Sequence, residues 1–421
     1  MKNIVQIGYI GLGRRGFNML KNFIDMKDVH VKSICDLKED AISAALPLFD
    51  ERGLARPKTT TDYHELLCDP EIDAIVIMNS WGTHASLARE SVLAGKYTAV
   101  EVGCAYTLAE CYQLIEAYET TQAPLMMLEN CCYDRREMMA LNMVKKGLFG
   151  EIVHCKGGYH HYLNDCELFK TNEETGKVDV EHYRVRDYIH RNCEQYPTHE
   201  FGPISKVLGI NRGNRMLTLS SFASKARGLK TYMEDHIDSS HPLYHAEVRQ
   251  GDIITTVITC ANGETVMLEL DTTVPRPYYS RNFTVRGTKG MCSEARKTFY
   301  LEGMGEEIEN NEKEFFEKYD HPLYKEYSQM QARGGHGGMD WLVIRAFVES
   351  VKRGIQTPID AYDTAAWMAI APLSEMSIAK GGMPVDVPDF TNGKWFCREP
   401  LDTGKYCLDE ICEEPETPIV P

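Results

Sequence analysis

The sequence predicts two domains: an α/β domain built on a doubly wound parallel sheet, and an α+β domain with an open, mostly antiparallel sheet. The chain has 421 residues, and hydrophobic cores stop growing at about 250–300 residues, so one core is not expected. Over roughly the first 130 residues, strand-like apolar runs alternate with helical stretches, which is typical of a parallel sheet. After Gly150 strand patterns predominate, which indicates an antiparallel sheet.

The elements of the first domain follow from its apolar runs. The predicted strands are Val5–Ile10, Val31–Cys35, Ala74–Met78, Thr98–Val102 and Leu125–Leu128. The predicted helices are Phe17–Asp25, Thr83–Ala94 and Leu108–Thr121. Asp69-Pro70 and Gly95-Lys96 fall where turns are needed.

The second domain shows the same kind of signals in a different order. The predicted strands are Glu151–Tyr159, Asp252–Ala261, Glu264–Thr272, Arg281–Arg286 and Thr298–Leu301. Asn262-Gly263 lies between two of them and is a hairpin signal. Met339, Val343, Phe347 and Val351 recur at helical spacing, and Ala361–Lys380 is expected to form another helix.

These patterns suggest where the domains begin and end. We expect residues 1–130 to form the first domain and residues 131–385 the second, with the helices around 339–380 packing back on the first domain. Residues 386–421 carry many prolines and acids, so we expect an irregular acidic tail.

Composition limits the possible partners. The chain has 46 Lys+Arg against 62 Asp+Glu, and its formal net charge of -16 argues against general binding to nucleic acid. No apolar run approaches the ~20 residues that span a bilayer. The N-terminus passes directly into a strand-like run without an export region, so we expect a cytoplasmic protein. The 14 cysteines include no CxxC pair, so neither a disulfide framework nor a zinc site is predicted.

The sharpest short motif is Gly11-Leu12-Gly13-Arg14-Arg15-Gly16, between a strand-like run and a helical stretch. Asp36 lies 20 residues past Gly16, at the end of the next strand. This context is the fingerprint of a Rossmann dinucleotide-binding domain, in which Gly11 allows the tight turn, Gly13 admits the pyrophosphate and Gly16 permits close packing. The helix N-terminus attracts the phosphates. Asp36 would bond the ribose hydroxyls and repel a 2′-phosphate, which favours NAD over NADP. The alternative is a glycine-rich turn in an unrelated α/β fold.

The next motifs resemble a known superfamily. Asn79-Ser80-Trp81-Gly82-Thr83-His84 follows the third main strand, and Glu101-Val102-Gly103 follows the next one. This arrangement resembles the glucose–fructose oxidoreductase and inositol dehydrogenase superfamily (Gfo/Idh/MocA). Many of its dehydrogenases carry Glu-Lys-Pro at the second motif, and that lysine helps deprotonate the substrate hydroxyl. Val102 cannot hold or donate a proton, so the chain departs there from an ordinary dehydrogenase of the superfamily.

Further blocks are similar to glycoside hydrolase family 109, whose founding activity is NAD-dependent α-N-acetylgalactosaminidase. They are Leu128–Tyr133, Asn142–Val144, Gly147–Glu151, Gly158–His161, Tyr196–Pro203, Pro275–Arg281 and Gly334–Asp340. The resemblance covers roughly residues 3 to 385. Many relatives have Tyr-x-His-Asp-Leu-Arg where His161 is followed here by Tyr162-Leu163-Asn164, and many carry an export signal. The exact sugar is therefore not inherited from the family.

The resemblance implies a hydrolysis that passes through a redox cycle. NAD+ takes a hydride from the sugar C3, the resulting ketone acidifies the C2 proton, and a base removes that proton and expels the C1 substituent. Water then adds at C1, and C3 is reduced again. This chemistry needs groups that pass protons near neutral pH.

The resemblance also implies the site residues. The catalytic set is Tyr159, His161, His199 and Glu129. Tyr196, Tyr279 and Trp81 contact the sugar, although Tyr278 is an alternative to Tyr279. The cofactor residues are Gly11, Gly13, Arg14, Arg15, Gly16, Asp36, Asn79, His84, Glu101, Asn130 and His336.

Individual roles within the catalytic set follow by family analogy. Tyr159 is the candidate for C2 proton transfer, oriented by Glu129, and His199 is the candidate for the C3 hydroxyl proton or the leaving group. Tyr159 and His161 lie two apart on a predicted strand, so both side chains point to one face. Residues 334–338 either close over nicotinamide or substrate, or form a flexible loop.

Two other functions remain open from the sequence. One is an NAD-dependent sugar or cyclitol dehydrogenase, against which Val102 argues. The other is a non-enzymatic NAD- or sugar-sensing regulator, which would not need the proton-transfer set. A metal site of His161, Glu129 and His199 is not predicted, because the spacing is long. The expected substrate is a small glycoside, and a dimer or tetramer is expected by analogy with the superfamily.

Overall fold

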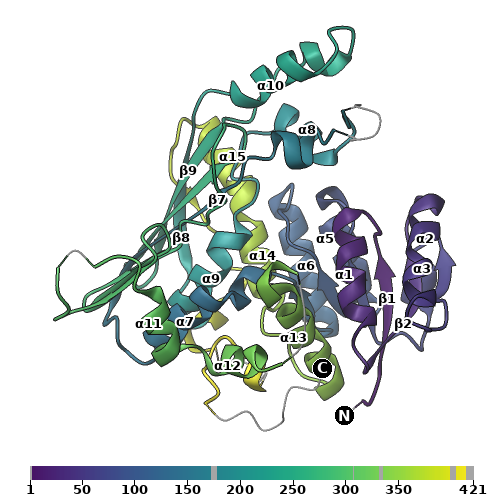
Figure 1. Cartoon of the computed structure of the whole chain (residues 1–421), viewed down its shortest axis with the longest axis horizontal. Coiled ribbons are helices and arrows are strands. Elements are labelled where there is room, and N and C mark those ends of the chain that lie inside the picture. Colours follow the sequence, from purple (N-terminus) through teal and green to yellow (C-terminus); the bar gives the residue numbers. More distant parts are fainter. Residues whose placement is uncertain (1, 172–177, 307, 331–334, 399–403, 414–421) are drawn as a thin grey trace.

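The computed structural model describes residues 2–171, 178–306, 308–330, 335–398 and 404–413, and it contains two sheets with helices packed around them (Figure 1). The first sheet has six parallel strands in the order β3-β2-β1-β4-β5-β6. Its strands are β1 (Val5–Ile10), β2 (Val29–Cys35), β3 (Lys58–Thr60), β4 (Ala74–Ile77), β5 (Tyr97–Val100) and β6 (Leu125–Met127). The predicted doubly wound α/β fold is confirmed.

The helices of this half connect successive strands. They are α1 (Arg14–Ile24), α2 (Glu39–Ala45), α3 (Pro47–Asp50), α4 (His64–Cys68), η1 (Trp81–Thr83), α5 (His84–Leu93) and α6 (Leu108–Thr121). The strand order reverses between β1 and β4, and ligands of such sheets bind outside the carboxyl ends of the strands at that point. Gly11 follows β1 and Asn79 follows β4 closely, so two predicted cofactor motifs meet there.

The second sheet has eight strands in the order β13-β12-β11-β7-β10-β9-β8-β14. They are β7 (Ile152–His160), β8 (Met216–Ala223), β9 (Ile253–Cys260), β10 (Thr265–Asp271), β11 (Thr284–Gly287), β12 (Gly290–Ser293), β13 (Thr298–Leu301) and β14 (Val385–Asp386). Within the described residues only the β7–β10 pair is parallel, so the prediction of a mostly antiparallel sheet is confirmed. Asn262-Gly263 lies in the β9–β10 hairpin, where Gly263 has φ +98°.

One face of this sheet is covered by helices. Residues along β9 and β10 alternate between buried and more exposed positions, and α9 packs against β7 while α15 packs against β8. The opposite face leaves Val153, Leu217, Phe222 and Val257 more than a third exposed. We call these four residues the open-face patch.

The remaining helices surround the second sheet and return to the first. They are η2 (Asn130–Tyr133), α7 (Arg135–Lys145), η3 (Asn164–Leu168), α8 (Tyr183–His190), α9 (Thr198–Leu208), α10 (Gly228–His236), η4 (Pro242–His245), α11 (Glu312–Tyr319), α12 (Pro322–Ser328), η5 (His336–Gly338), α13 (Met339–Arg353), α14 (Ala361–Met368), α15 (Ile370–Ala379), η6 (Lys394–Cys397) and η7 (Gly404–Tyr406). α13 contacts α1 and β1, and α14 contacts α6 and β6. In the described residues no helix is long and apolar enough to cross a bilayer.

The expected helix Ala361–Lys380 is divided into α14 and α15 at Ala369. Pro372 explains the break, because proline has no N–H to donate to the carbonyl of Met368, four residues earlier. The Ala105 N–H donates to that carbonyl instead, at 3.2 Å. The break therefore joins the returning helices to the loop after β5.

A partly buried ion pair ties α13 to the first sheet. Arg345, 2% exposed, donates to both carboxylate oxygens of Asp28 at 2.7 and 2.6 Å, and Lys352 donates to the same carboxylate at 2.6 Å. Burial alone would raise the pKa of Asp28, but the hydrogen bonds from Arg345 and Lys352 outweigh it and lower the pKa to about 2. The contact holds α13 beside the turn that precedes β2.

Arg345→Met tests this tie. We expect the variant to lose about 3 kcal/mol of unfolding free energy, because it leaves a partly buried carboxylate with Lys352 alone. Urea denaturation at neutral pH measures the loss. Arg296→Met is the matched control, since Arg296 is 68% exposed and its pair with Glu309 is worth at most about 1 kcal/mol. Equal losses in both variants would contradict the assignment.

Candidate active site

The three glycines of the turn after β1 have different surroundings. Gly11 has φ +95°, and a Cβ there would lie 2.6 Å from the Asn79 backbone nitrogen. A Cβ at Gly16 would lie 2.1 Å from the Gly11 carbonyl oxygen. A Cβ at Gly13 would meet nothing within 4 Å, so the turn is open at its centre. Two glycines therefore close the turn on β4 and α1, and the third leaves room for a pyrophosphate at the start of α1.

Asp36 lies beside this turn. Its Oδ2 accepts from the Leu12 N–H at 2.7 Å, and its Oδ1 accepts from the Lys38 N–H at 2.9 Å. The carboxylate is partly exposed at the end of β2. It is placed where the fingerprint needs an acceptor for ribose hydroxyls, so the residues present fit NAD.

Asp340 collects three of the predicted cofactor residues. Arg15 donates to both of its oxygens at 2.8 and 2.9 Å, Asn130 donates at 2.7 Å, and His336 Nδ1 lies 2.9 Å away. Burial would raise the pKa of Asp340, but the bonds from His336 and Arg15 hold it well below its usual value. Asp340 was not among the predicted site residues, although it ends the glycine-rich block Gly334–Asp340. Gly334 lies outside the described residues.

Arg15 also reaches Glu101 after β5. Its Nε donates to Glu101 Oε2 at 3.3 Å, and burial raises the pKa of Glu101 despite the nearby guanidinium. His336 is 61% exposed on its side chain and has φ +52°. The arrangement links the glycine turn, the end of β5 and the start of α13, and it leaves His336 at the surface of the group.

The motif after β4 forms one wall of the site. His84 is buried and its Nε2 lies 2.8 Å from the Asn79 carbonyl oxygen, and burial lowers its pKa to about 4, so the ring stays neutral. Trp81 is 4% exposed. A Cβ at Gly103 would lie 2.6 Å from Trp81 Cδ1, so only glycine fits beside this indole. Val102 is buried.

Glu129 and His199 come from the two halves of the chain. Glu129 follows β6 and is fully buried, while His199 stands in the first turn of α9. His199 Nδ1 lies 2.7 Å from Glu129 Oε1, and His199 Nε2 lies 3.2 Å from Tyr196 Oη. Burial alone would raise the pKa of Glu129, yet His199 and the hydrogen bonds to the carboxylate hold it below its usual value. Glu129 fixes the imidazole so that Nε2 faces the tyrosine.

Tyr159 and His161 share one side of the chain at the end of β7, as the spacing predicts. Tyr159 Oη lies 3.1 Å from His161 Nδ1. Burial raises the pKa of Tyr159 and lowers that of His161, so both are neutral at rest. Tyr279 packs edge-on against His161 with ring centroids 5.2 Å apart. Tyr278 is 66% exposed and lies under Arg276, so only Tyr279 belongs to the cluster.

The tyrosine rings join the two pairs into one site. The ring centroid of Tyr159 lies 4.5 Å from that of Tyr196 and 5.7 Å from that of His199. Tyr196 in turn stacks on Trp81 at 5.3 Å. All the predicted catalytic and sugar-contacting side chains thus lie in one continuous aromatic and imidazole cluster.

Sequence reasoning missed two charged residues of this cluster. The Arg184 guanidinium lies over Trp81 at 4.3 Å and over Tyr196 at 5.0 Å, measured to the ring centroids. Its Nη1 lies 2.8 Å from Glu167 Oε1 in η3. Neither residue sits in a recognisable motif, so no sequence signal pointed to them.

Glu129, His199 and Cys131 are close enough to hold a metal ion, with ligand atoms within 4.8 Å of one another. Hydrogen bonds already account for this geometry, because Glu129 Oε1 accepts from the Cys131 N–H at 3.0 Å as well as facing His199. Burial raises the pKa of the Cys131 thiol well above its usual value, which disfavours the thiolate that binds metals. His161 is not part of this group.

Two family models match the chain. The model described as "Oxidoreductase family, NAD-binding Rossmann fold" matches residues 5–129, and the model described as "Glycosyl hydrolase 109, C-terminal domain" matches residues 133–397. A glycosyl hydrolase family 109 protein of Stenotrophomonas maltophilia is 38% identical over 96% of this chain and 93% of its own length. A protein of Tannerella forsythia named alpha-N-acetylgalactosaminidase is 37% identical over 94% of this chain and 88% of its own length.

Solved structures resemble the fold at lower identity. A levoglucosan dehydrogenase in complex with NADH and levoglucosan has a TM-score of 0.66 and 17% identity, covering 91% of this chain and 100% of that one. A probable dehydrogenase from Thermotoga maritima has a TM-score of 0.62 and 18% identity, covering 91% and 99%. These similarities support the fold alone.

Gly13→Val tests the opening in the glycine turn. Gly13 has φ −58° and ψ 174°, which any residue adopts, so we expect the variant to fold and to bind NAD about tenfold more weakly because the side chain fills the opening. Gly16→Val is expected to unfold at lower temperature instead, because its Cβ meets the Gly11 carbonyl. Fluorescence titration with NAD and thermal unfolding separate the two effects. Undiminished NAD affinity in Gly13→Val would remove the turn from the cofactor site.

Glu167→Gln tests whether Glu167 holds Arg184 against the aromatic wall. Loss of one charge-assisted bond is expected to raise KM for the glycoside about tenfold with little change in kcat, because the predicted sugar-contacting residues Trp81 and Tyr196 would bind substrate and transition state alike. Steady-state kinetics measure both constants. Glu181→Gln, at an exposed position near α8, is the control. A fall in kcat at unchanged KM would contradict this positioning role.

Proposed function

The chain belongs to glycosyl hydrolase family 109 and is an NAD-dependent glycosidase, and on that premise we propose how its site works and what it accepts. The observation that carries the proposal is the paired arrangement of Tyr159 with His161 and of Glu129 with His199 around one aromatic cluster. In each pair one side chain can take a proton from the substrate, and its hydrogen-bonded partner sets the protonation state of that side chain. Val102, buried where dehydrogenases of the superfamily carry lysine, leaves these pairs to handle the protons.

Bound NAD supplies reversible hydride transfer at the sugar C3, which makes the neighbouring C2 proton acidic. His199 is placed to take the proton of the C3 hydroxyl. Glu129 bonds its Nδ1, which leaves Nε2 free of a proton and stabilises the imidazolium once Nε2 accepts one. Tyr196 Oη lies 3.2 Å from Nε2, and the C3 hydroxyl of the sugar would bind beside it, within reach of the same nitrogen.

Tyr159 removes the proton from the sugar C2. Its phenol is neutral at rest because burial raises its pKa, so it must lose its own proton before acting as a base. His161 is neutral because burial lowers its pKa, and its Nδ1 accepts the phenolic proton across 3.1 Å. Tyr159 then takes the C2 proton as the C1 substituent departs, and the same pair returns a proton after water adds at C1.

Trp81, Tyr196 and Tyr279 bind the sugar in this proposal. Flat aromatic walls suit the apolar faces of a pyranose, and Arg184 adds a guanidinium over two of the rings. Two relatives carry the name alpha-N-acetylgalactosaminidase, which makes an α-N-acetylgalactosaminide the first substrate to try. His161-Tyr162-Leu163-Asn164 departs from the pattern of many relatives, so other glycosides belong in the same panel.

The runner-up function is a sugar or cyclitol dehydrogenase that releases NADH. The fold that this chain shares with dehydrogenases is compatible with that activity, whereas Val102 and the two proton-transfer pairs oppose it. A sensor that only binds NAD or sugar is disfavoured by the same pairs.

A cytoplasmic, oligomeric state completes the proposal. The cysteines from Cys35 to Cys397 form no disulfide bond among the described residues, which suits a reducing compartment, and the net charge of -16 disfavours nucleic acid as a partner. The open-face patch on the second sheet offers apolar surface for pairing two copies. Size-exclusion chromatography with light scattering tests the oligomer.

Nitrophenyl glycosides test the reaction. We expect nitrophenol release without net NADH, since the hydride is returned in each turnover. Tyr159→Phe and His199→Ala should each lower kcat at least about 100-fold while NAD stays bound, because each removes a proton carrier. Tyr278→Phe is the matched control and should keep full activity, since that tyrosine is exposed outside the cluster.

Two outcomes would overturn the proposal. Stoichiometric NADH accumulation with a free sugar would assign the dehydrogenase. Near-full activity in Tyr159→Phe or His199→Ala would remove that residue from the proton-transfer set and leave the family assignment untouched.

A further inference from the structure

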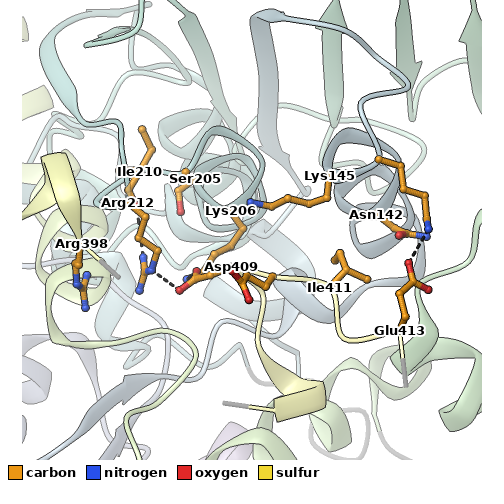
Figure 2. Close-up of a pocket in the computed structure, with 13 residues that line it drawn as sticks. Asn142, Lys145, Ser205, Lys206, Ile210, Arg212, Arg398, Asp409, Ile411 and Glu413 are labelled. Carbon is orange, nitrogen blue, oxygen red and sulfur yellow. Dashed lines mark hydrogen bonds and ion pairs between the residues drawn. The ribbon is translucent and has the colours of Figure 1, made fainter. Parts of the chain in front are cut away.

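A cavity lies away from the candidate active site, at the far end of α9. Its volume is about 490 Å³, and it is bounded by the last turn of α7, the end of α9 and the C-terminal segment 404–413 (Figure 2). α9 carries His199 in its first turn and Lys206 in its last, about 10 Å apart along the axis. The cavity is thus separate from the catalytic cluster, and its volume is in the range of small-molecule sites.

Basic side chains line this cavity. Lys145 and Lys146 come from α7 and its end, Lys206 from α9, Arg212 from the following loop, and Arg398 from the chain after η6. The lining acids all come from the C-terminal segment. They are Asp409, Glu410 and Glu413.

Acidic side chains of the C-terminal segment form ion pairs with these basic residues. Asp409 forms ion pairs with Lys206, at 3.3 Å, and with Arg212, and Figure 2 shows the second contact as a dashed line. Glu413 pairs with Lys146 at 2.6 Å. Two acids on one short segment therefore occupy part of the basic surface with carboxylate oxygens.

Two acids that do not line the cavity, Asp360 and Asp363, also form ion pairs with its basic residues. Asp363 pairs with Lys206 at 2.9 Å and with Arg212 at 2.8 Å. Asp360 pairs with Arg212 and with Arg398. These contacts hold Lys206, Arg212 and Arg398 in the cavity wall.

Lys145 has no hydrogen bond or ion pair within the described part of the chain, and in Figure 2 its side chain extends from α7 toward Lys206. Burial lowers its pKa, and the charge of Lys206 acts in the same direction while Asp409 opposes it. Arg398 Nη1 is buried without a hydrogen-bond partner among the described residues. Both donors are thus available to an anion. The Lys145 side chain is exposed and can turn to a ligand, whereas Arg398 Nη1 is buried, where a donor without a partner is costly.

We propose that this cavity is a binding site for a small dianion of the phosphate class. Its oxygens accept from Lys145 Nζ and compete with the Asp409 carboxylate for Lys206 and Arg212. A phosphate group carries more negative charge than the carboxylate it displaces, so it compensates Lys145 as well. The proposal does not rest on the glycosidase reaction, because none of these residues touches the catalytic cluster.

Thermal unfolding of the NAD-saturated protein with added inorganic phosphate tests the site. Saturation with NAD keeps phosphate out of the glycine turn, and chloride at equal ionic strength corrects for screening. Millimolar phosphate should raise Tm, since a ligand that binds only the folded state stabilises it by mass action. Lys145→Gln, which breaks no contact of the described chain, should weaken the apparent affinity about tenfold. Asp409→Asn, which removes the competing carboxylate, should show a larger rise than the unchanged protein.

Lys225→Gln is the matched control, at an exposed lysine after β8 that does not line the cavity, and it should respond like the unchanged protein. An equal rise in Lys145→Gln and in the unchanged protein would overturn the proposal, as would the absence of any rise in both the unchanged protein and Asp409→Asn. Glucose 6-phosphate at the same concentration distinguishes a phosphate ester from free phosphate as the ligand. A larger rise than with inorganic phosphate assigns a phosphate ester, and an equal or smaller rise assigns free phosphate.

Discussion

A fully buried carboxylate has to be paired, and the pairing of Glu129 is the constraint around which the active site is arranged. Glu129 stands at the end of the last strand of the first sheet, and its partner His199 begins the helix that covers the second sheet. An unpaired charge at that depth costs several kcal/mol, so the two halves of the chain must meet at this bond. The start of α9 then fixes Tyr196, which stacks on Trp81 from the first half and lies against Tyr159 from the second.

Asp340 is a second buried carboxylate that has to be paired, and it lies among the predicted cofactor residues. Its carboxylate is nearly buried, and it is held by Arg15 of the glycine turn and by Asn130, next to Glu129 in sequence. α13 therefore carries the chain back to the first sheet and closes the cofactor site with a charge that needs those partners. Because Asn130 and Glu129 are neighbours, a predicted cofactor residue and a predicted catalytic residue share one short segment after β6. Movement of that segment would disturb both pairs together.

Local signals predicted most of the fold and the core of the site. The glycine turn and the central strands could be predicted because their residues are close in sequence and their pattern is strict. The edge strand β3 was missed because Lys58–Thr60 is short and largely exposed, and the split of Ala361–Lys380 was missed because Pro372 acts four residues upstream. Arg184 and Glu167 could not be predicted, because Glu167 of η3 and Arg184 of α8 are distant in sequence and meet only in the folded chain. Long-range pairs of this kind have no fixed spacing in a sequence.

Val102 and Gly103 explain why this site differs from that of a dehydrogenase of the superfamily. Any Cβ at position 103 would lie 2.6 Å from Trp81, so the proline found in Glu-Lys-Pro cannot coexist with the indole where it stands. Val102 is buried in the hydrophobic core, and its side chain has no proton to transfer. The aromatic wall therefore accounts for the glycine at position 103, and the absence of a lysine at position 102 is a separate difference next to it. In the mechanism that we propose, a sugar stacked on that wall meets Tyr159 and His199 instead of an ammonium group. The two proton-transfer pairs would then serve elimination at C2 as well as oxidation at C3.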